Sequence, residues 1–151
     1  MKRNHYAITE LLPHQPPMIL LDDLISYDEN EAVALVTITE ASLFCSGDGV
    51  PAHVGLEYMA QTCGAHAGAI ARERGEAVKI GLLLGTRQYR ANIPNFRLGD
   101  RLTIRVRVLY TDEQMGAFDC RIERDGELAA DAQLNVYQPN QAELASVGAA
   151  P

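Results

Sequence analysis

The sequence predicts an α+β domain in which one long helix packs against a single, mostly antiparallel sheet. Three observations carry this prediction. A run from about Pro51 to Arg74 has helical spacing and helical boundaries, strand-like runs precede it, and four or five more follow it, joined by short turns. At 151 residues the chain has the size of one domain with one hydrophobic core.

Two strands are expected before the helix. The prolines at positions 13, 16 and 17 forbid a regular helix, and the apolar run "MILLDDLI" that follows is compatible with a strand. Glu31 to Ile38 alternates and is rich in β-formers, so it predicts a second strand. The stretch "FCSGDGVPA" contains glycines and a proline, which predicts a loop before the helix.

The strand-like runs after the helix are "VKIGLLLGTRQYR", "DRLTIRVRVLYTDEQ", "GAFDCRIERDG" and "ELAADAQLNVYQP". The segments "DEQMG" and "RDGE" consist of turn residues and predict hairpins, which make the flanking strands antiparallel. We therefore expect a single domain over residues 1–140. The small and polar residues 141–151 predict a flexible C-terminal tail.

The predicted helix is rich in very small residues. Pro51 in its first turn and Gly75 just past its end are typical of helix boundaries. Glycine inside a helix costs about 1 kcal/mol relative to alanine, so we expect other backbone to approach closely, as in a curved sheet wrapped around the helix. On such a helix a buried Glu57 and Gln61 need hydrogen-bond partners. An apolar stripe at helical spacing comprises Leu56, Ala60, Cys63, Ala67 and Ile70.

Composition narrows the function classes. A net charge of −7 disfavours nucleic-acid binding. The apolar runs are too short to span a membrane, and the N-terminus lacks the apolar stretch of a signal peptide. Three cysteines without C-x-x-C spacing predict reduced thiols and a cytoplasmic location. The histidines and carboxylates lack metal-ligand spacing, so no metal site is expected.

His53 and Glu57 are the first candidates for chemistry. They are four residues apart, so a helix places both on one face. Two interpretations stay open: a catalytic acid/base pair, or a solvated polar face of the helix. Gln61 lies a further four residues along, and we expect it to hydrogen-bond the Glu57 carboxylate and orient it.

Three sequence blocks resemble a known family. They are "LLPHQPPMILLDDL", "HVGLEYMAQTCG" and "GLLLGTRQYRANIPNFRLGDRLTIRV", and they are similar, in this order, to blocks of the hot-dog fold dehydratases that act on β-hydroxyacyl-acyl-carrier-protein. The segments "VGLEYMAQ", "LLLGTRQY" and "DEQMGAFDCRI" resemble the dehydratase-like subgroup associated with aryl polyene synthesis. The resemblance implies a sheet wrapped around the central helix and a homodimer or heterodimer with active sites at the interface.

The resemblance also implies site residues. It places the catalytic acid at Glu57, and oxyanion or substrate-binding groups at Ala52, Gly85 and Gln61. The family's second catalytic group, a histidine fourteen residues before the acid, is replaced by Leu43. Three interpretations of this loss stay open. His53 substitutes for the histidine, a related dehydratase chain supplies it, or the chain binds acyl groups without chemistry.

The implied function is dehydration of 3-hydroxyacyl-acyl-carrier-protein thioesters to 2-enoyl thioesters, in fatty-acid-like or polyene biosynthesis and without a cofactor. The chain acts as the enzyme or as a dehydratase subunit. The alternatives are a non-catalytic acyl-binding or scaffold subunit and a hot-dog thioesterase in which Glu57 activates water. His14 is expected to anchor the N-terminal block, and His66 to lie against strands or a dimer partner. An acidic carrier requires a basic patch, with the candidates Arg87, Arg90, Arg97 and Arg101.

Overall fold

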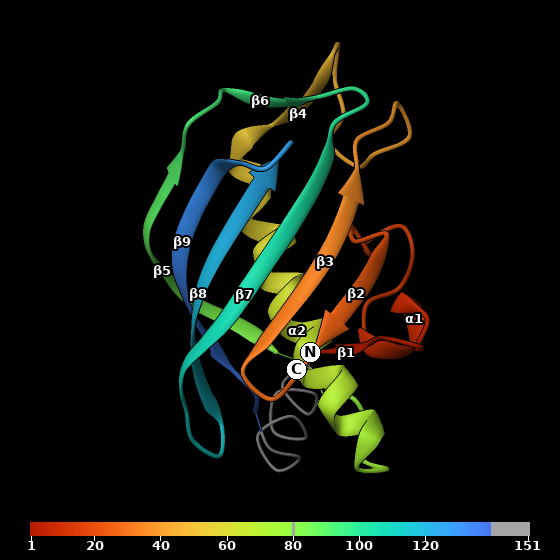
Figure 1. The fold of residues 1–151 in the computed structure, drawn as a ribbon, viewed down its shortest axis with the longest axis vertical. Coiled ribbons are helices and arrows are strands. Elements are labelled where there is room, and N and C mark those ends of the chain that lie inside the picture. Colours follow the sequence, from red (N-terminus) through yellow and green to blue (C-terminus); the bar gives the residue numbers. More distant parts are fainter. Residues whose placement is uncertain (80, 140–151) are drawn as a thin grey trace, which may run out of the picture.

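A seven-stranded antiparallel sheet curves around one long helix (Figure 1). The computed structural model describes residues 1–79 and 81–139, so the predicted tail 141–151 lies outside the described residues. The helix α2 spans Gly55–Glu73. The sheet contains β1 (Lys2–Arg3), β2 (Asp23–Tyr27), β3 (Glu31–Thr37), β5 (Leu82–Ala91), β7 (Arg101–Thr111), β8 (Met115–Arg124) and β9 (Glu127–Tyr137). The predicted α+β, hot-dog fold is confirmed.

The strand order is β1-β2-β3-β7-β8-β9-β5. A small second sheet pairs β4 (Gly49–Pro51) with β6 (Asn95–Arg97) at the end of the fold where α2 begins (Figure 1). The sequence predicts only a loop at β4, and that prediction is wrong because three residues paired with a distant strand carry no recognisable periodicity. The short helix α1 (Ile8–Leu11) was also not predicted.

The sheet follows from strict alternation along its central strands. In β7, Leu102, Ile104 and Val106 are buried, whereas the alternate positions Arg101, Arg105 and Arg107 are exposed. Side chains of opposite faces alternate along a strand, so this pattern fixes which face covers the helix. The predicted β8–β9 hairpin is confirmed: Asp125 and Gly126 both have positive φ, at 54° and 79°, as tight hairpin turns require.

The glycines of α2 permit the close approach that the sequence predicts. A Cβ at Gly68 would lie 2.1 Å from the backbone oxygen of Leu11, so only glycine lets α1 cross the helix there. The apolar stripe is less well predicted, because of its members only Cys63 is fully buried. The buried face instead contains Tyr58, Met59 and small residues. Among the described residues, no helix is both long and apolar enough to cross a bilayer.

The two edges of the sheet differ in length. One edge is the two-residue strand β1, whereas the other is β5, which has ten residues and lies at the outer side of the molecule in Figure 1. Its first part exposes three consecutive leucines, with Leu82 48% and Leu84 57% accessible. Long apolar edge strands are sites at which another chain can add to the sheet.

Candidate active site at the start of the long helix

The start of α2 is held by segments that are distant in sequence. β4 leads into one 3₁₀ turn, η1 (Ala52–Val54), and α2 follows, so Pro51 ends a strand rather than opening the helix as predicted. The N–H of Ala52 donates to the carbonyl of Pro94 at 3.1 Å, and its carbonyl accepts the hydroxyl of Tyr89. Both backbone groups of Ala52 are thereby fixed.

Tyr89 reaches the helix from a bulge in the edge strand. The pairing of β5 with β9 shifts between Arg87 and Arg90, and Gln88 has a φ of 54°. Burial raises the pKa of Tyr89 to about 12, so its hydroxyl stays protonated and can donate. Gly55 makes room for it, because a Cβ there would lie 2.5 Å from the Tyr89 hydroxyl oxygen. Sequence reasoning missed Tyr89, since a bulge leaves no periodic signal.

Glu57 lies in the first turn of α2 with its side chain exposed. Among the described residues it has no hydrogen-bond or ion-pair partner, so the expected burial of this carboxylate is not found in the single chain. Helix N–H dipoles favour an acidic group in the first turn. The arrangement leaves a negatively charged group available to whatever approaches this end of the helix.

Gln61 does not orient Glu57, and the predicted hydrogen bond between them is wrong. Gln61 is only 3% exposed, and its carbonyl accepts the N–H of Leu20 at 2.8 Å. Its amide donates to the carbonyl of Met18, also at 2.8 Å. A side-chain amide can accept one hydrogen bond and donate another, and so join two backbone groups. Gln61 therefore fixes the proline-rich segment before β2 against the helix.

His53 lies in η1, one turn before Glu57, and is exposed. The described residues offer it no hydrogen-bond partner, Glu57 included. Both side chains are exposed, and no hydrogen bond or ion pair joins them in the described chain. That they share one face stays a prediction.

The remaining predicted site residues lie on two elements. The N–H of Ala52 is occupied by Pro94, so the expected oxyanion donor is engaged within the chain. Gly85 lies in β5 next to a register shift, and a Cβ there would meet no atom within 4 Å. Tyr89 joins this strand to Ala52. Gly85 therefore lies on the edge strand that is tied to the start of α2.

The residue that replaces the family's histidine lies in the turns before β4. Leu43 is half-buried, and the next residue, Phe44, has a φ of 70° and is 54% exposed. His14 is exposed and makes no hydrogen bond to a described residue, so its predicted anchoring role is wrong. His66 lies against a strand, as predicted, with its ring edge toward Phe118 at a centroid separation of 6.3 Å.

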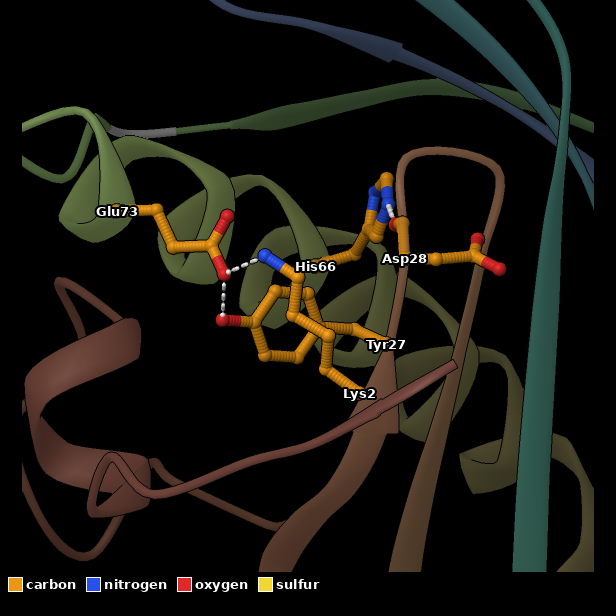
Figure 2. A network of polar contacts seen from close by, with 5 residues as sticks. All are labelled: Lys2, Tyr27, Asp28, His66 and Glu73. Carbon is orange, nitrogen blue, oxygen red and sulfur yellow. Dashed lines mark hydrogen bonds and ion pairs between the residues drawn. The ribbon is translucent and has the colours of Figure 1, made fainter.

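Toward the other end of α2, Glu73 and His66 are both hydrogen-bonded (Figure 2). Glu73 accepts the Tyr27 hydroxyl at 2.6 Å and the Lys2 ammonium at 2.7 Å through the same oxygen. His66 bonds the carbonyl of Asp28 at 2.7 Å. Hydrogen bonding from Lys2 and Tyr27 lowers the pKa of Glu73, and burial lowers the pKa of His66. This network connects the N-terminal strand, β2 and the helix.

Two of the three cysteines are buried in the core. Cys63 and Cys120 are buried with their sulfurs 3.9 Å apart, and Cys45 is half-buried. Burial raises the pKa of Cys63, so its thiol stays protonated and unreactive. The predicted burial of most of the cysteines is confirmed, and their reduced state stays a prediction.

The carboxylate site of a single chain is not enclosed. Two hollows, of about 360 and 540 Å³, are lined by the outer face near β5 and by the C-terminal half of α2, and neither includes His53 or Glu57. Proton transfer to a thioester needs a site shielded from water. Another surface must cover Glu57 before such chemistry can occur.

Comparison with known proteins identifies the family. A family model described as ApeP-like, ApeP dehydratase, matches residues 6–147. The chain belongs to the ApeP-like dehydratase family. A chain in the structure of the dehydratase heterocomplex ApeI:P from Xenorhabdus doucetiae is 32% identical, with a TM-score of 0.90, over 97% of this chain and 100% of that one. The predicted dehydratase family and subgroup are confirmed.

Curated relatives agree with this family. The 3-hydroxyacyl-[acyl-carrier-protein] dehydratase FabZ of Streptococcus gordonii is 28% identical over 133 residues, which cover 85% of this chain and 92% of the relative. FabZ of Bartonella quintana is 31% identical over 144 residues, covering 84% of each. A Streptococcus pneumoniae hypothetical thioesterase with coenzyme A is 14% identical at a TM-score of 0.61, which shows a shared fold alone.

Proposed function

We propose that this chain is a subunit of a dehydratase that converts 3-hydroxyacyl-carrier-protein thioesters to 2-enoyl thioesters, with Glu57 as one of its two proton-transfer groups. The observation that carries the proposal is the position of Glu57. It is an exposed carboxylate without a partner among the described residues, in the first turn of the central helix of an ApeP-like chain. The relatives named FabZ are dehydratases of such thioesters.

The reaction needs two positioned groups. A base removes a proton from C2 of the thioester, and an acid protonates the hydroxyl on C3, which leaves as water while the C2–C3 double bond forms. Glu57 delivers or accepts one of these protons. Negative charge that develops on the thioester oxygen requires N–H donors other than that of Ala52, which is bonded to Pro94.

The second group comes from another chain. Leu43 cannot transfer a proton, and the histidine of this chain that is nearest to Glu57 in sequence is His53, in η1 one turn before it. We infer that a related dehydratase chain packs along β5 and brings a histidine to Glu57. The exposed leucines of β5 and the unenclosed carboxylate support this assembly, and the similar Xenorhabdus chain comes from a heterocomplex.

An acidic acyl carrier protein would dock at the end of the fold where α2 begins. Arg97 lies in β6, opposite Gly49 of β4, and Arg101 begins β7. Both are exposed, and neither forms an ion pair with a described residue. Arg90, by contrast, lies 3.6 Å from Asp131. Arg97 and Arg101 are therefore the arginines that we assign to carrier docking.

One assay tests the activity. The protein is incubated alone and with a related dehydratase that carries the upstream histidine, and 3-hydroxyacyl carrier protein is supplied. We expect 2-enoyl product only when both chains are present. We expect no product when the Glu57→Gln variant takes the place of the wild type. Release of free acid and thiol would instead identify a thioesterase. Retained acyl binding without turnover, with any partner, would identify a scaffold subunit and overturn the proposal.

Two further variants test the assignments within this assay. His53→Ala is expected to keep the rate of the two-chain enzyme, and a loss comparable to that of Glu57→Gln would make His53 the missing base. Arg97→Glu with Arg101→Glu is expected to raise KM for the carrier-bound substrate and to leave a pantetheine-linked substrate unaffected. Arg121→Glu, on the exposed face of β8, is the matched control.

A further inference from the structure

A second site lies beside the C-terminal half of α2. The hollow there has a volume of about 540 Å³, within the range of small-molecule sites. Its buried and half-buried lining includes the apolar side chains of Ile70, Val108, Phe118 and Val136, together with the amides of Gln114 and Gln138. The charged side chains that line it, such as Arg74, Glu76, Lys79 and Glu113, are all exposed and form its rim. The interior is therefore uncharged.

One polar side chain of this lining is almost fully buried. His66 lines the hollow and is only 6% exposed, with its ring edge on Phe118 at an interplanar angle of 80°. Its Nε2 lies 2.7 Å from the carbonyl oxygen of Asp28. A carbonyl oxygen only accepts, so Nε2 carries the hydrogen, and in the neutral ring Nδ1 is left with a lone pair.

The Nδ1 lone pair has no partner in the described chain. The two ring nitrogens point in diverging directions, so Nδ1 does not face the Asp28 carbonyl that Nε2 binds (Figure 2). No fully buried side-chain nitrogen or oxygen of the described residues lacks a partner. The unpaired Nδ1 must therefore reach open space, and the open space that His66 borders is the hollow. It is an acceptor at a hollow whose buried and half-buried lining residues carry no charge.

We propose that this hollow binds a neutral, slender apolar molecule with one hydroxyl, an alcohol or a phenol, whose O–H donates to Nδ1 of His66. An ion would have to leave water for an apolar interior, which is costly without a charged partner. A pure hydrocarbon would leave the lone pair unpaired, which disfavours it relative to a hydroxyl donor.

The cavity is separate from the proposed carboxylate site. His66 lies nine residues beyond Glu57, or about 14 Å along the helix. Its hydroxyl ligand has two sources: a free molecule, or the far end of an acyl chain whose thioester lies at Glu57. Binding of a free probe does not depend on the dehydratase activity, so the two proposals fail separately.

The test compares 4-ethylphenol with 4-ethyltoluene, which replaces the hydroxyl by a methyl group of similar size. NMR titration of the wild type is expected to show roughly five- to tenfold tighter binding of the phenol. The phenol alone should shift the Nδ1 resonance of His66. His66→Phe keeps a ring and removes the acceptor, and should bring the affinity ratio to about one. Ala67→Leu, which fills the cavity from α2, should weaken both probes.

Three outcomes overturn the proposal: no binding of either probe, an affinity ratio that His66→Phe leaves unchanged, or binding that survives Ala67→Leu. The Nδ1 shift is read in the wild type, so it decides even if His66→Phe does not fold. The two sources are then separated by competition. A phenol that competes with long acyl substrates but not with short ones occupies the end of the acyl site, and one that leaves turnover unchanged marks an independent site.

Discussion

The two ends of α2 carry similar side chains, which are unpaired at one end and hydrogen-bonded toward the other. At its N-terminal end, His53 and Glu57 are exposed and have no partner among the described residues. Toward its C-terminal end, His66 is bonded to a backbone carbonyl, and Glu73 accepts two hydrogen bonds (Figure 2). Each end has one histidine and one carboxylate, so the residue types alone do not distinguish them.

The difference indicates which of the two carboxylates stabilises the fold. A paired group contributes to the stability of the chain, and its removal leaves partners unsatisfied. An unpaired group at a helix start contributes little and remains available for a ligand or a second chain. The comparison predicts that substitutions at the two ends separate activity from stability.

The largest expected effect is on activity. Glu57→Gln should lower the rate of 2-enoyl formation by the two-chain enzyme by about a hundred- to ten-thousandfold, because a positioned proton-transfer group is lost. Its thermal stability should match the wild type, since the carboxylate is exposed and unpaired. Glu73→Gln should lower the thermal stability and leave the rate of 2-enoyl formation unchanged. A Glu57→Gln enzyme with normal turnover would erase the distinction between the two ends.

The second effect concerns the packing between the two ends. Gly68→Ala should lower the free energy of unfolding by about 1–3 kcal/mol, because the new Cβ would overlap the Leu11 backbone. Helix propensity alone predicts the opposite sign. Gly64→Ala is the control, since its Cβ would meet only the flexible Leu12 side chain at 3.3 Å. Equal denaturation midpoints for both variants would contradict the close approach.

A smaller effect is expected at the paired end. Tyr27→Phe removes one hydrogen bond to Glu73 while the buried ring stays in place, so it should cost about 1 kcal/mol in urea denaturation. Tyr6→Phe, whose hydroxyl has no hydrogen bond to a described residue, is the control and should change little. A Tyr27→Phe protein as stable as this control would show that the network does not stabilise the fold.

The smallest effect is the pH dependence of the ion pair. Hydrogen bonding from Lys2 lowers the pKa of Glu73 below its ordinary 4.5, so its contribution to stability is present above pH 4.5 and is lost as pH falls through the lowered value. Hydrogen bonding to Glu73 raises the pKa of Lys2 above 10.5, so that contribution is lost at higher pH. The stability gap between wild type and Glu73→Gln should therefore shrink at both extremes. A gap that is constant with pH would exclude the ion pair.

The sequence predicts the fold where periodicity is long and regular. The alternation in β7 predicts the sheet correctly, and the run from Pro51 to Gly75 predicts the helix, which begins at Gly55 in the structure. β4 and β6 escaped prediction because three-residue strands depend on a tertiary contact between distant segments. Local pattern contains no information about such a contact.

The candidate site shows the same limit. Glu57 was found because a continuous motif surrounds it, yet its relation to Gln61 was predicted wrongly. Two residues that are four positions apart on a helix differ in direction by about 40°. At the boundary between the exposed and the buried face of α2, this difference leaves Glu57 in solvent and places Gln61 in the core. Tyr89 acts through a β5 bulge, which no spacing rule foresees.

The hydroxyl of Tyr89 joins the open edge of the sheet to the first turn of α2. A partner chain that packs along β5 contacts the strand that contains Tyr89. The hydrogen bond from Tyr89 connects this strand to the backbone of Ala52, five residues before Glu57. In the proposed assembly, a substitution that changes the β5 edge is therefore expected to change the alignment of the Glu57 carboxylate as well.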